Sequence, residues 1–528
     1  MKSKGYVALV LNAHIPFVRN PEYPTFLEER WLFEALSETY LPLLRSFRTL
    51  ERDGIPFKVT FNVSPTLCSM LGDPVLGERY IAYLDTQIAL GEREVARTAG
   101  DDRFGPLASM YLELYREDRK DYVELYSRDV LGALDYHYKK GRVELMTTAA
   151  THAFLPNFQL VPEALAAQIE TAMVNHRSRF GKQPTGIWLP HLGWYPGVED
   201  LLKAYNLQYT VVTTRGALLG KPLPRSGSFE PVQCPNGFTV FIRDAAATEA
   251  VWADRTGYPG DPVYRDFYRD IGFDLPEPEI SAFVPDGRGA VYTGFKYWAV
   301  TGRTADKRPY DRAAAEAKAV EHAIAFLDGR QGKAGAAAQS LDRPPLMVCP
   351  YDAELFGHWW FEGPLWLEAL FRNAKGRELS FVTLGEYHHL YPESQVSTPE
   401  LSSWGDGGYG ELWLDGSNDW TYRHIFKACE RMTELAERFP DESGLRERIL
   451  NQAAREVLLA MGSDWPLLMR TGRSSGFARE RVEDAIGNFN KIYDMLSANT
   501  VATEWLTRLE KRNNIFPMMN YRMFRRKR

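Results

Sequence analysis

The feature that most constrains the fold of this chain is an alternation of short apolar runs with amphipathic, helix-like stretches. Strands that alternate with helices predict a parallel sheet covered by helices. Beyond about residue 420 only helical periodicity remains, which predicts an all-helical C-terminal region. Apolar runs of strand length occur at residues 6–11, 57–61, 186–190, 209–213, 238–243 and 346–348. Helical periodicity is found over 28–40, 76–134, 162–180 and 313–327.

Two stretches of different composition interrupt this pattern. Residues 331–343 are rich in Gly and Ala, and we expect a surface loop or linker there. Residues 392–401 are polar and precede the C-terminal helices, so they indicate a domain boundary. With 528 residues, the chain is too long for a single compact domain unless that domain is a barrel.

Composition excludes several classes of function. The formal net charge of -6 offers no basic field for nucleic acid. Four Cys without paired spacing predict neither a disulfide framework nor a zinc site. No apolar run approaches membrane-spanning length, and the run at 6–11 is too short for the core of a signal peptide. We therefore expect a soluble, cytoplasmic protein that binds neither nucleic acid nor membrane.

Side chains able to carry out chemistry cluster after the apolar run Leu346–Val348. They are two carboxylates, a His and two Trp: Asp352, Glu354, His358, Trp359 and Trp360. In folds built on parallel strands, catalytic groups lie at the carboxyl ends of the strands. Carboxyl groups beside flat rings suit a sugar site, where a ring stacks on a pyranose and an acid protonates the glycosidic oxygen. In the alternative interpretation the Asp caps the next helix and the tryptophans belong to the core.

The segment Cys349–Pro364 closely resembles the fourth signature region of glycoside hydrolase family 57, in its branching-enzyme branch. The other signatures of the family are matched by Asn12–Pro16, Gly141–His152, Gly186–Gly197 and Ser402–Tyr409. The resemblance covers nearly the whole chain. It implies an α/β fold, a distorted (β/α)7 barrel with inserted helical segments over residues 1–395. A C-terminal helical domain over 396–528 would contribute Trp404 and Trp413 to the cleft.

The resemblance also implies roles for single residues. Asp352 matches the general acid/base of the family. Substrate binding is expected of eight further residues: His14, Glu144, His152, Trp31, Trp360, Trp404, Trp413 and Asp464. The expected ligand is an α-1,4-glucan, such as amylose, a glycogen-like polysaccharide or a maltooligosaccharide. No cofactor and no metal are expected.

One central position departs from the family pattern. The third signature reads Trp-Leu-Pro-Glu, whose Glu is the nucleophile, whereas this chain has His191 at that position. A retaining mechanism needs two carboxyl groups about 5–5.5 Å apart. A neutral imidazole cannot stabilise the oxocarbenium-like transition state with negative charge. Asn12 replaces the first His of the first signature, and Ser226 stands where we expect a Tyr in a loop over the active site.

Three hypotheses for function stay open. The first is an α-1,4-glucan-binding protein of the branching-enzyme type whose retaining chemistry is impaired by loss of the nucleophile. The second is an active branching enzyme or α-glucan hydrolase that uses Asp352 with a recruited second group. The candidates for that group are Glu354, Glu144 and Asp244 as carboxylates, or His191 as a general base. The third is a metal-dependent sugar site formed by His14, His152, His191 and Asp352.

Overall fold

A parallel sheet forms the centre of the computed structural model, which describes residues 4–253, 256–284, 291–302, 304, 306–405 and 407–527. Its strands run in the order β4-β3-β2-β1-β8, and β9 also pairs with β1. They are β1 (Gly5–Ala13), β2 (Val59–Val63), β3 (Val143–Thr148), β4 (Ile187–Trp188), β8 (Leu346–Asp352) and β9 (Leu379–Phe381). Every residue of β2 and β4 is buried, as expected for a parallel sheet covered on both faces.

A second sheet, in the order β10-β6-β7-β5, continues the first one. Its strands are β5 (Tyr209–Val212), β6 (Val232–Gln233), β7 (Thr239–Ile242) and β10 (Gln395–Val396). Isolated parallel bridges join Gly186 to Tyr209 and Arg243 to Val348. The circuit β1-β2-β3-β4-β5-β7-β8 therefore closes irregularly, which confirms the predicted distorted seven-stranded barrel.

Helices between the strands cover this barrel. They are α2 (Leu41–Arg52), α3 (Pro65–Leu71), α6 (Val130–Lys139), α7 (Pro162–Phe180), α8 (Val198–Ala204), α9 (Thr214–Leu218), α10 (Ala245–Trp252), α13 (Arg312–Ala337), α14 (Gly363–Asn373) and α15 (Leu384–Leu390). Local sequence fixes their starts. Ser64 caps α3 by accepting a hydrogen bond from the Leu67 amide, and Thr383 and Glu386 form a capping box at α15.

The prediction of a loop over 331–343 is wrong for its first half, because α13 continues to Ala337. Ala has the highest helix propensity, and this offsets the cost of the three Gly at 329, 332 and 335. Ala334 is also buried, close to Gly5 at the start of β1. Packing against the barrel therefore stabilises the end of this helix.

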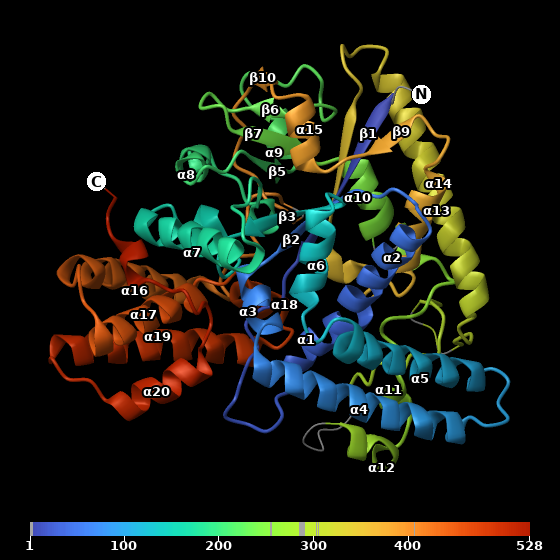
Figure 1. Ribbon diagram of the computed structural model, residues 1–528, viewed down its shortest axis with the longest axis horizontal. Coiled ribbons are helices and arrows are strands. Elements are labelled where there is room, and N and C mark those ends of the chain that lie inside the picture. Colours follow the sequence, from blue (N-terminus) through green and yellow to red (C-terminus); the bar gives the residue numbers. More distant parts are fainter. Residues whose placement is uncertain are drawn as a thin grey trace.

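Further helices are inserted between the barrel segments. α4 (Pro74–Arg97) and α5 (Gly105–Lys120) form an antiparallel pair at the lower right of Figure 1, near the short helices α11 (Ile271–Asp274) and α12 (Glu277–Ile280). α1 (Glu29–Ala35) leads into a π-helical turn, Leu36–Tyr40, which leads directly into α2. π-helical turns widen a helix locally and are common at functional sites.

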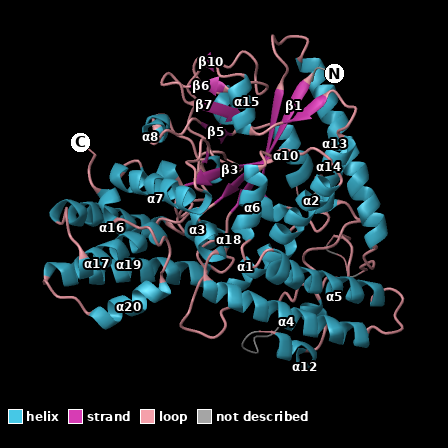
Figure 2. Cartoon of the chain, in the orientation of Figure 1, coloured by secondary structure: helices cyan, strands magenta, loops and turns pink. Residues whose placement is uncertain are grey.

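The C-terminal region consists of α16 (Asp419–Arg438), α17 (Gly444–Ala460), α18 (Asp464–Thr471), α19 (Ser475–Ser497) and α20 (Thr503–Arg512). Figure 2 shows helices and loops only in this part of the molecule. The predicted boundary at 395/396 falls within β10, which pairs with β6, so the chain leaves the second sheet only after Val396. Among the described helices, none is both long and apolar enough to span a bilayer.

Candidate active site

Three polar side chains lie side by side where adjacent barrel strands end. The strand register pairs Asn12 of β1 with Asn62 of β2 and with Asp352, the last residue of β8. Asn62 Nδ2 donates to Asn12 Oδ1 at 2.6 Å, and Asn12 Nδ2 donates to Asp352 Oδ1 at 3.0 Å. Burial raises the pKa of Asp352, while the hydrogen bond from Asn12 opposes this shift. The hydrogen bond holds the Asp352 carboxyl in one orientation, and the raised pKa lets it keep its proton to a higher pH. Both properties suit a general acid/base.

A second carboxyl lies two residues beyond Asp352. Glu354 Oε1 accepts hydrogen bonds from the Tyr40 hydroxyl at 2.5 Å and from the His14 amide at 3.2 Å. Burial raises the pKa of Glu354 to about 8, and the negative charge of Asp352 adds to the shift. Glu354 is therefore mostly a neutral acid at pH 7, and a neutral acid cannot serve as an anionic nucleophile.

The three histidines predicted for the site do meet at this end of the barrel. The rings of His14 and His152 stack with centroids 4.0 Å apart, and His152 meets His191 edge-on at 4.9 Å. Nδ1 of His14 is bonded to Ser64 Oγ at 2.8 Å and Nε2 to Asp464 Oδ2 at 2.9 Å. Asp464, from the start of α18, is thereby drawn into the barrel mouth.

His191 is held by two residues of the C-terminal region. Its ring stacks on Trp413 at 4.2 Å, and its Nε2 lies 2.8 Å from Ser463 Oγ. Ser463 donates its single hydroxyl proton to the His152 carbonyl, so His191 must be the donor in the other bond and carries its proton on Nε2. Burial lowers the pKa of His191 to about 3, against the opposing charge of Asp464. The imidazole is thus neutral at physiological pH and is a weak base.

This arrangement does not suit a metal ion. Both ring nitrogens of His14 are already bonded, and its parallel stacking on His152 directs the nitrogens of the two rings side by side. Within the described ranges, no group of three His, Cys, Asp or Glu side chains could hold a metal. The geometry therefore gives the metal-dependent alternative no support.

Two family models match the chain. The glycosyl hydrolase family 57 model covers residues 8–400, and the model for the C-terminal region of 1,4-alpha-glucan branching enzymes covers 424–524. The chain belongs to glycosyl hydrolase family 57. The family accounts for the barrel, and the second match accounts for the C-terminal helices that supply Ser463 and Asp464.

Similar proteins place the chain within the family. The 1,4-alpha-glucan branching enzyme of Thermococcus kodakarensis is 30% identical over 97% of this chain and 77% of its own length. Among solved structures, the alpha-amylase AmyC of Thermotoga maritima matches 100% of both chains at 37% identity with a TM-score of 0.93. The family 57 branching enzyme of Pyrococcus horikoshii matches 99% of this chain and 97% of its own at 28% identity, with a TM-score of 0.89.

Two of the tryptophans predicted to bind substrate are buried in this family 57 protein. Trp360 is 1% exposed and packs against Trp366, and Trp413 is 2% exposed between Phe154 and His191. Contrary to the prediction, neither ring presents a free face to a ligand.

Of the two other predicted aromatic contacts, Trp404 is half-buried against Trp188 and Trp252, and Arg243 lies over its ring. Trp31 is half-buried and meets Phe477 edge-on at 5.7 Å. Both rings therefore keep part of their surface open, unlike the two buried tryptophans, and a sugar contact stays a prediction for each.

Two of the carboxylates considered as substitutes for the nucleophile have structural partners. Glu144 lies near the amino end of β3, where it accepts hydrogen bonds from Thr60 Oγ1 at 2.9 Å, the Gly385 amide at 3.0 Å and the Tyr209 hydroxyl. This position, away from the carboxyl ends of the strands, also contradicts the substrate contact predicted for Glu144.

The Asp244 carboxylate also has structural partners. It caps α10 and forms ion pairs with Arg330 at 2.9 Å and Lys333 at 2.7 Å, with a side chain only 2% exposed. A carboxylate neutralised by two cations is a poor candidate for attack on a sugar.

The structure reveals functional candidates that were not predicted. The aromatic surface cluster, defined as Phe267, Tyr268, Phe273, Tyr292 and Trp359, contains four rings that are each at least 36% exposed. Phe267 contacts other rings of the cluster, and its ring centroid lies 4.3 Å from that of Trp359 and 5.7 Å from that of Tyr292. The Trp359 amide donates to the Glu354 carbonyl, so the cluster adjoins the segment that carries the acid. The Trp-Trp doublet at 359–360 could have indicated one exposed ring, but not which one.

Proposed function

We propose that this family 57 protein binds α-1,4-glucan chains of the amylose, glycogen or maltooligosaccharide type, and that its retaining chemistry is strongly impaired. The observation that carries the proposal is the environment of His191. The imidazole is buried and neutral, donates its Nε2 proton to Ser463 and packs on Trp413. It supplies no negative charge at the position that matches the nucleophile of the family.

The chemical consequence follows from charge. A retaining enzyme forms a glycosyl ester with one carboxylate while the other gives and then takes a proton. A glycosyl adduct on imidazole would be cationic, and a base whose conjugate acid has a pKa of about 3 activates water poorly. Loss of a nucleophile of this kind lowers turnover by roughly 10⁴-fold or more.

Glucan binding has separate support. The aromatic surface cluster adjoins the Glu354 segment, and exposed rings are the side chains on which pyranose faces stack. The similar proteins are named as enzymes of alpha-glucan branching and as an alpha-amylase. An inactive barrel that keeps exposed rings beside its acid is suited to hold a glucan chain.

Two measurements on the purified protein test the proposal. Calorimetric titration with maltoheptaose and with glycogen should show association at micromolar to millimolar sugar. Incubation with amylose should then produce few α-1,6 linkages and few reducing ends. No association at millimolar maltoheptaose would refute glucan binding, and branching at the rate of the Thermococcus kodakarensis enzyme would refute the impairment.

A second candidate function rests on Asp464. Its Oδ2 lies 2.9 Å from His14 Nε2, its side chain is 17% exposed, and its charge acts on His191. It is therefore an acidic group at the barrel mouth that could act with Asp352 in an active branching enzyme or α-glucan hydrolase. Under this alternative, Asp464→Asn abolishes a measurable turnover while maltoheptaose binding persists. Unchanged turnover in that variant excludes the alternative.

A further inference from the structure

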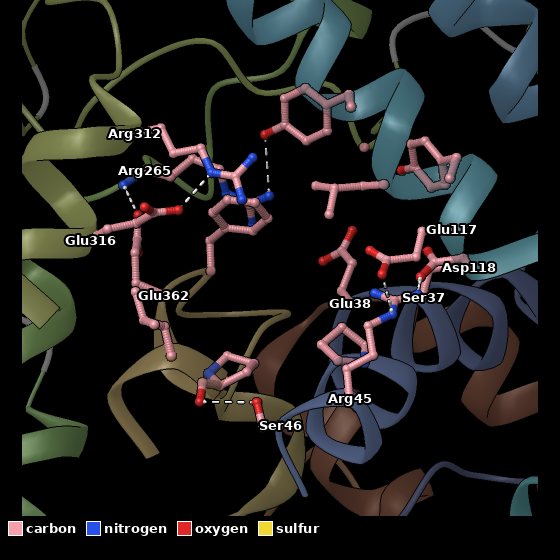
Figure 3. A pocket seen from close by; sticks show the side chains of 18 of the residues that line it. Ser37, Glu38, Arg45, Ser46, Glu117, Asp118, Arg265, Arg312, Glu316 and Glu362 are labelled. Carbon is pink, nitrogen blue, oxygen red and sulfur yellow. Dashed lines mark hydrogen bonds and ion pairs between the residues drawn. The ribbon is translucent and has the colours of Figure 1, made fainter. Parts of the chain in front are cut away.

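A cavity of about 240 Å³ lies beside the barrel, between the π-helical turn with α2, the helix α5, and the segments around Arg265 and Glu362. Figure 3 shows two walls facing each other across open space. Arg265, Arg312, Glu316 and Glu362 form one wall, and Glu38, Glu117, Asp118 and Arg45 form the other. None of the residues of the candidate active site lines this cavity.

The cavity is charged on both walls without being simply an anion or a cation site. Six carboxylates and three guanidinium groups line it. Burial raises the pKa of Asp118 to about 7, which leaves that group partly neutral at physiological pH. An anion would be repelled by the carboxylates, and a cation would meet the buried Arg265. The lining is therefore best matched by a neutral ligand that both donates and accepts hydrogen bonds.

Several polar groups of the cavity have unused bonding capacity. Arg265 is only 3% exposed, yet its Nε has no hydrogen-bond partner within the part of the chain that the structure describes. Its two other contacts are long, at 3.4 Å to the Tyr111 hydroxyl and 3.3 Å to the His358 carbonyl. Glu362, also 3% exposed, has the Tyr310 hydroxyl as a hydrogen-bonding neighbour, although its Oε2 and that hydroxyl do not meet strict hydrogen-bond geometry. Buried donors and acceptors are normally satisfied, so these atoms point to a ligand.

The size and surface of the cavity define that ligand further. Its volume lies below the roughly 300 Å³ at which pockets for drug-sized molecules begin, and it suits a molecule of about twelve non-hydrogen atoms. Tyr111, Tyr115 and Phe361 offer apolar ring surface beside the charged groups. Planar carboxylates and guanidinium groups bind pairs of neighbouring hydroxyls, and aromatic rings cover the C–H faces of a sugar.

We propose that this cavity is a binding site for one neutral hexose, separate from the barrel mouth. The Arg265 guanidinium and the Glu362 carboxylate bind its hydroxyl groups, and Glu38 and Asp118 complete the opposite side. The inference does not depend on the proposed function, because it concerns other residues and holds whether or not the barrel turns over glucan.

D-glucose is the probe, titrated by calorimetry into the whole protein both without maltoheptaose and in the presence of saturating maltoheptaose. The titration should reveal one remaining site with a Kd on the order of 1 mM, as expected for twelve non-hydrogen atoms. Glu362→Gln keeps the shape of the side chain and removes its charge, so it should weaken glucose binding at least tenfold. Glu386→Gln, in the capping box of α15, is the matched control and should leave glucose binding unchanged.

Three results would overturn the site: no glucose binding beside saturating maltoheptaose, the same affinity in Glu362→Gln as in the wild type, or glucose-soaked crystals with only water in the cavity. The crystals also decide the matter if Glu362→Gln does not fold, since they require only the wild-type chain.

Discussion

The two sides of the barrel mouth differ in the ionisable groups that they carry. The acid wall is made of Asn62, Asn12, Asp352, Glu354 and Tyr40. Hydrogen bonds run from Asn62 through Asn12 to Asp352, and a separate bond from Tyr40 holds Glu354. The histidine wall is made of His14, His152, His191, Ser463 and Trp413. It is held by ring stacking and by hydrogen bonds to Ser463, Ser64 and Asp464. The carboxyl groups of the acid wall can donate and accept a proton, whereas His191 in the histidine wall is neutral. Under the proposed function, one half of a catalytic pair stays ordered while the position of its partner belongs to the packing.

The largest expected effect comes from restoring a carboxylate in the histidine wall. His191→Glu should raise the turnover of amylose by roughly 10³-fold, because it supplies a carboxylate at the position that matches the nucleophile of the family. The backbone has a φ of 58° at this position, a left-handed conformation that a side chain other than glycine already occupies. Reducing ends and α-1,6 linkages are counted over time.

His191→Gln is the matched control, because it has a similar size and no charge, and it should gain nothing. Adding Asp352→Asn to the Glu variant should remove most of the gain, by about 10²-fold or more. If the wild type turns over amylose as fast as the Glu variant does, the difference between the two walls does not affect catalysis.

The next effect concerns the acid wall and pH. The pKa of Glu354 is raised to about 8 in the fold, so the folded state holds a proton that the unfolded chain releases near pH 4.5. The raised pKa of Glu354 stabilises the folded state fully below pH 4.5, and this contribution, on the order of 5 kcal/mol, is lost as the pH rises through about 8. Glu354→Gln, whose amide oxygen can still accept from Tyr40 and His14, should flatten the fall in Tm between pH 5 and 8.

Thermal unfolding across that pH range, followed by circular dichroism, provides the measurement. The control is Glu386→Gln, a carboxyl-to-amide change in the capping box of α15, and its profile should follow the wild type. An unchanged slope in Glu354→Gln would mean that Glu354 is ionised in the folded protein.

A smaller loss is expected at the serine that organises the histidine wall. Ser463→Ala removes the acceptor for His191 Nε2 and the donor to the His152 carbonyl. A buried imidazole N–H without a partner costs about 1–3 kcal/mol, so the free energy of unfolding should fall by roughly 2 kcal/mol. Urea unfolding at pH 7 measures it, and Ser463→Thr, which keeps the hydroxyl, should recover part of the loss. Equal losses in both variants would show that space, not hydrogen bonding, matters there.

Much of this fold could be predicted because buried parallel strands are nearly continuous apolar runs, as β1 and β8 show. The polar residues at strand ends, Asn12 and Asp352, were therefore placed correctly at one edge. Glu144 was misplaced because a signature match does not say at which end of a strand a side chain lies. Ser463 had no signal of its own beside Asp464, since its role depends on contacts with His152 and His191 far away in the sequence.

Burial of single aromatic residues was the least predictable property. Trp359 and Trp360 follow a strand in an irregular segment, where neither the period of a helix nor that of a strand indicates which side chain points inward. The C-terminal Trp413 is covered by Phe154 and His191 from two other segments, which no local pattern could indicate.

The smallest expected effect distinguishes the two members of this tryptophan doublet. Trp359 is 38% exposed and Trp360 only 1%, so their truncation should affect different quantities. Trp359→Ala should weaken maltoheptaose binding about fivefold, near 1 kcal/mol, because one stacking surface is lost while the core is intact. Trp360→Phe should instead lower the Tm and leave the affinity of the remaining folded protein unchanged, since its ring contacts only protein. If Trp359→Ala binds maltoheptaose as well as the wild type does, the glucan does not cross the aromatic surface cluster. Binding must then depend on the half-buried Trp404 and Trp31, whose substitution by Ala would be measured next in the same titration.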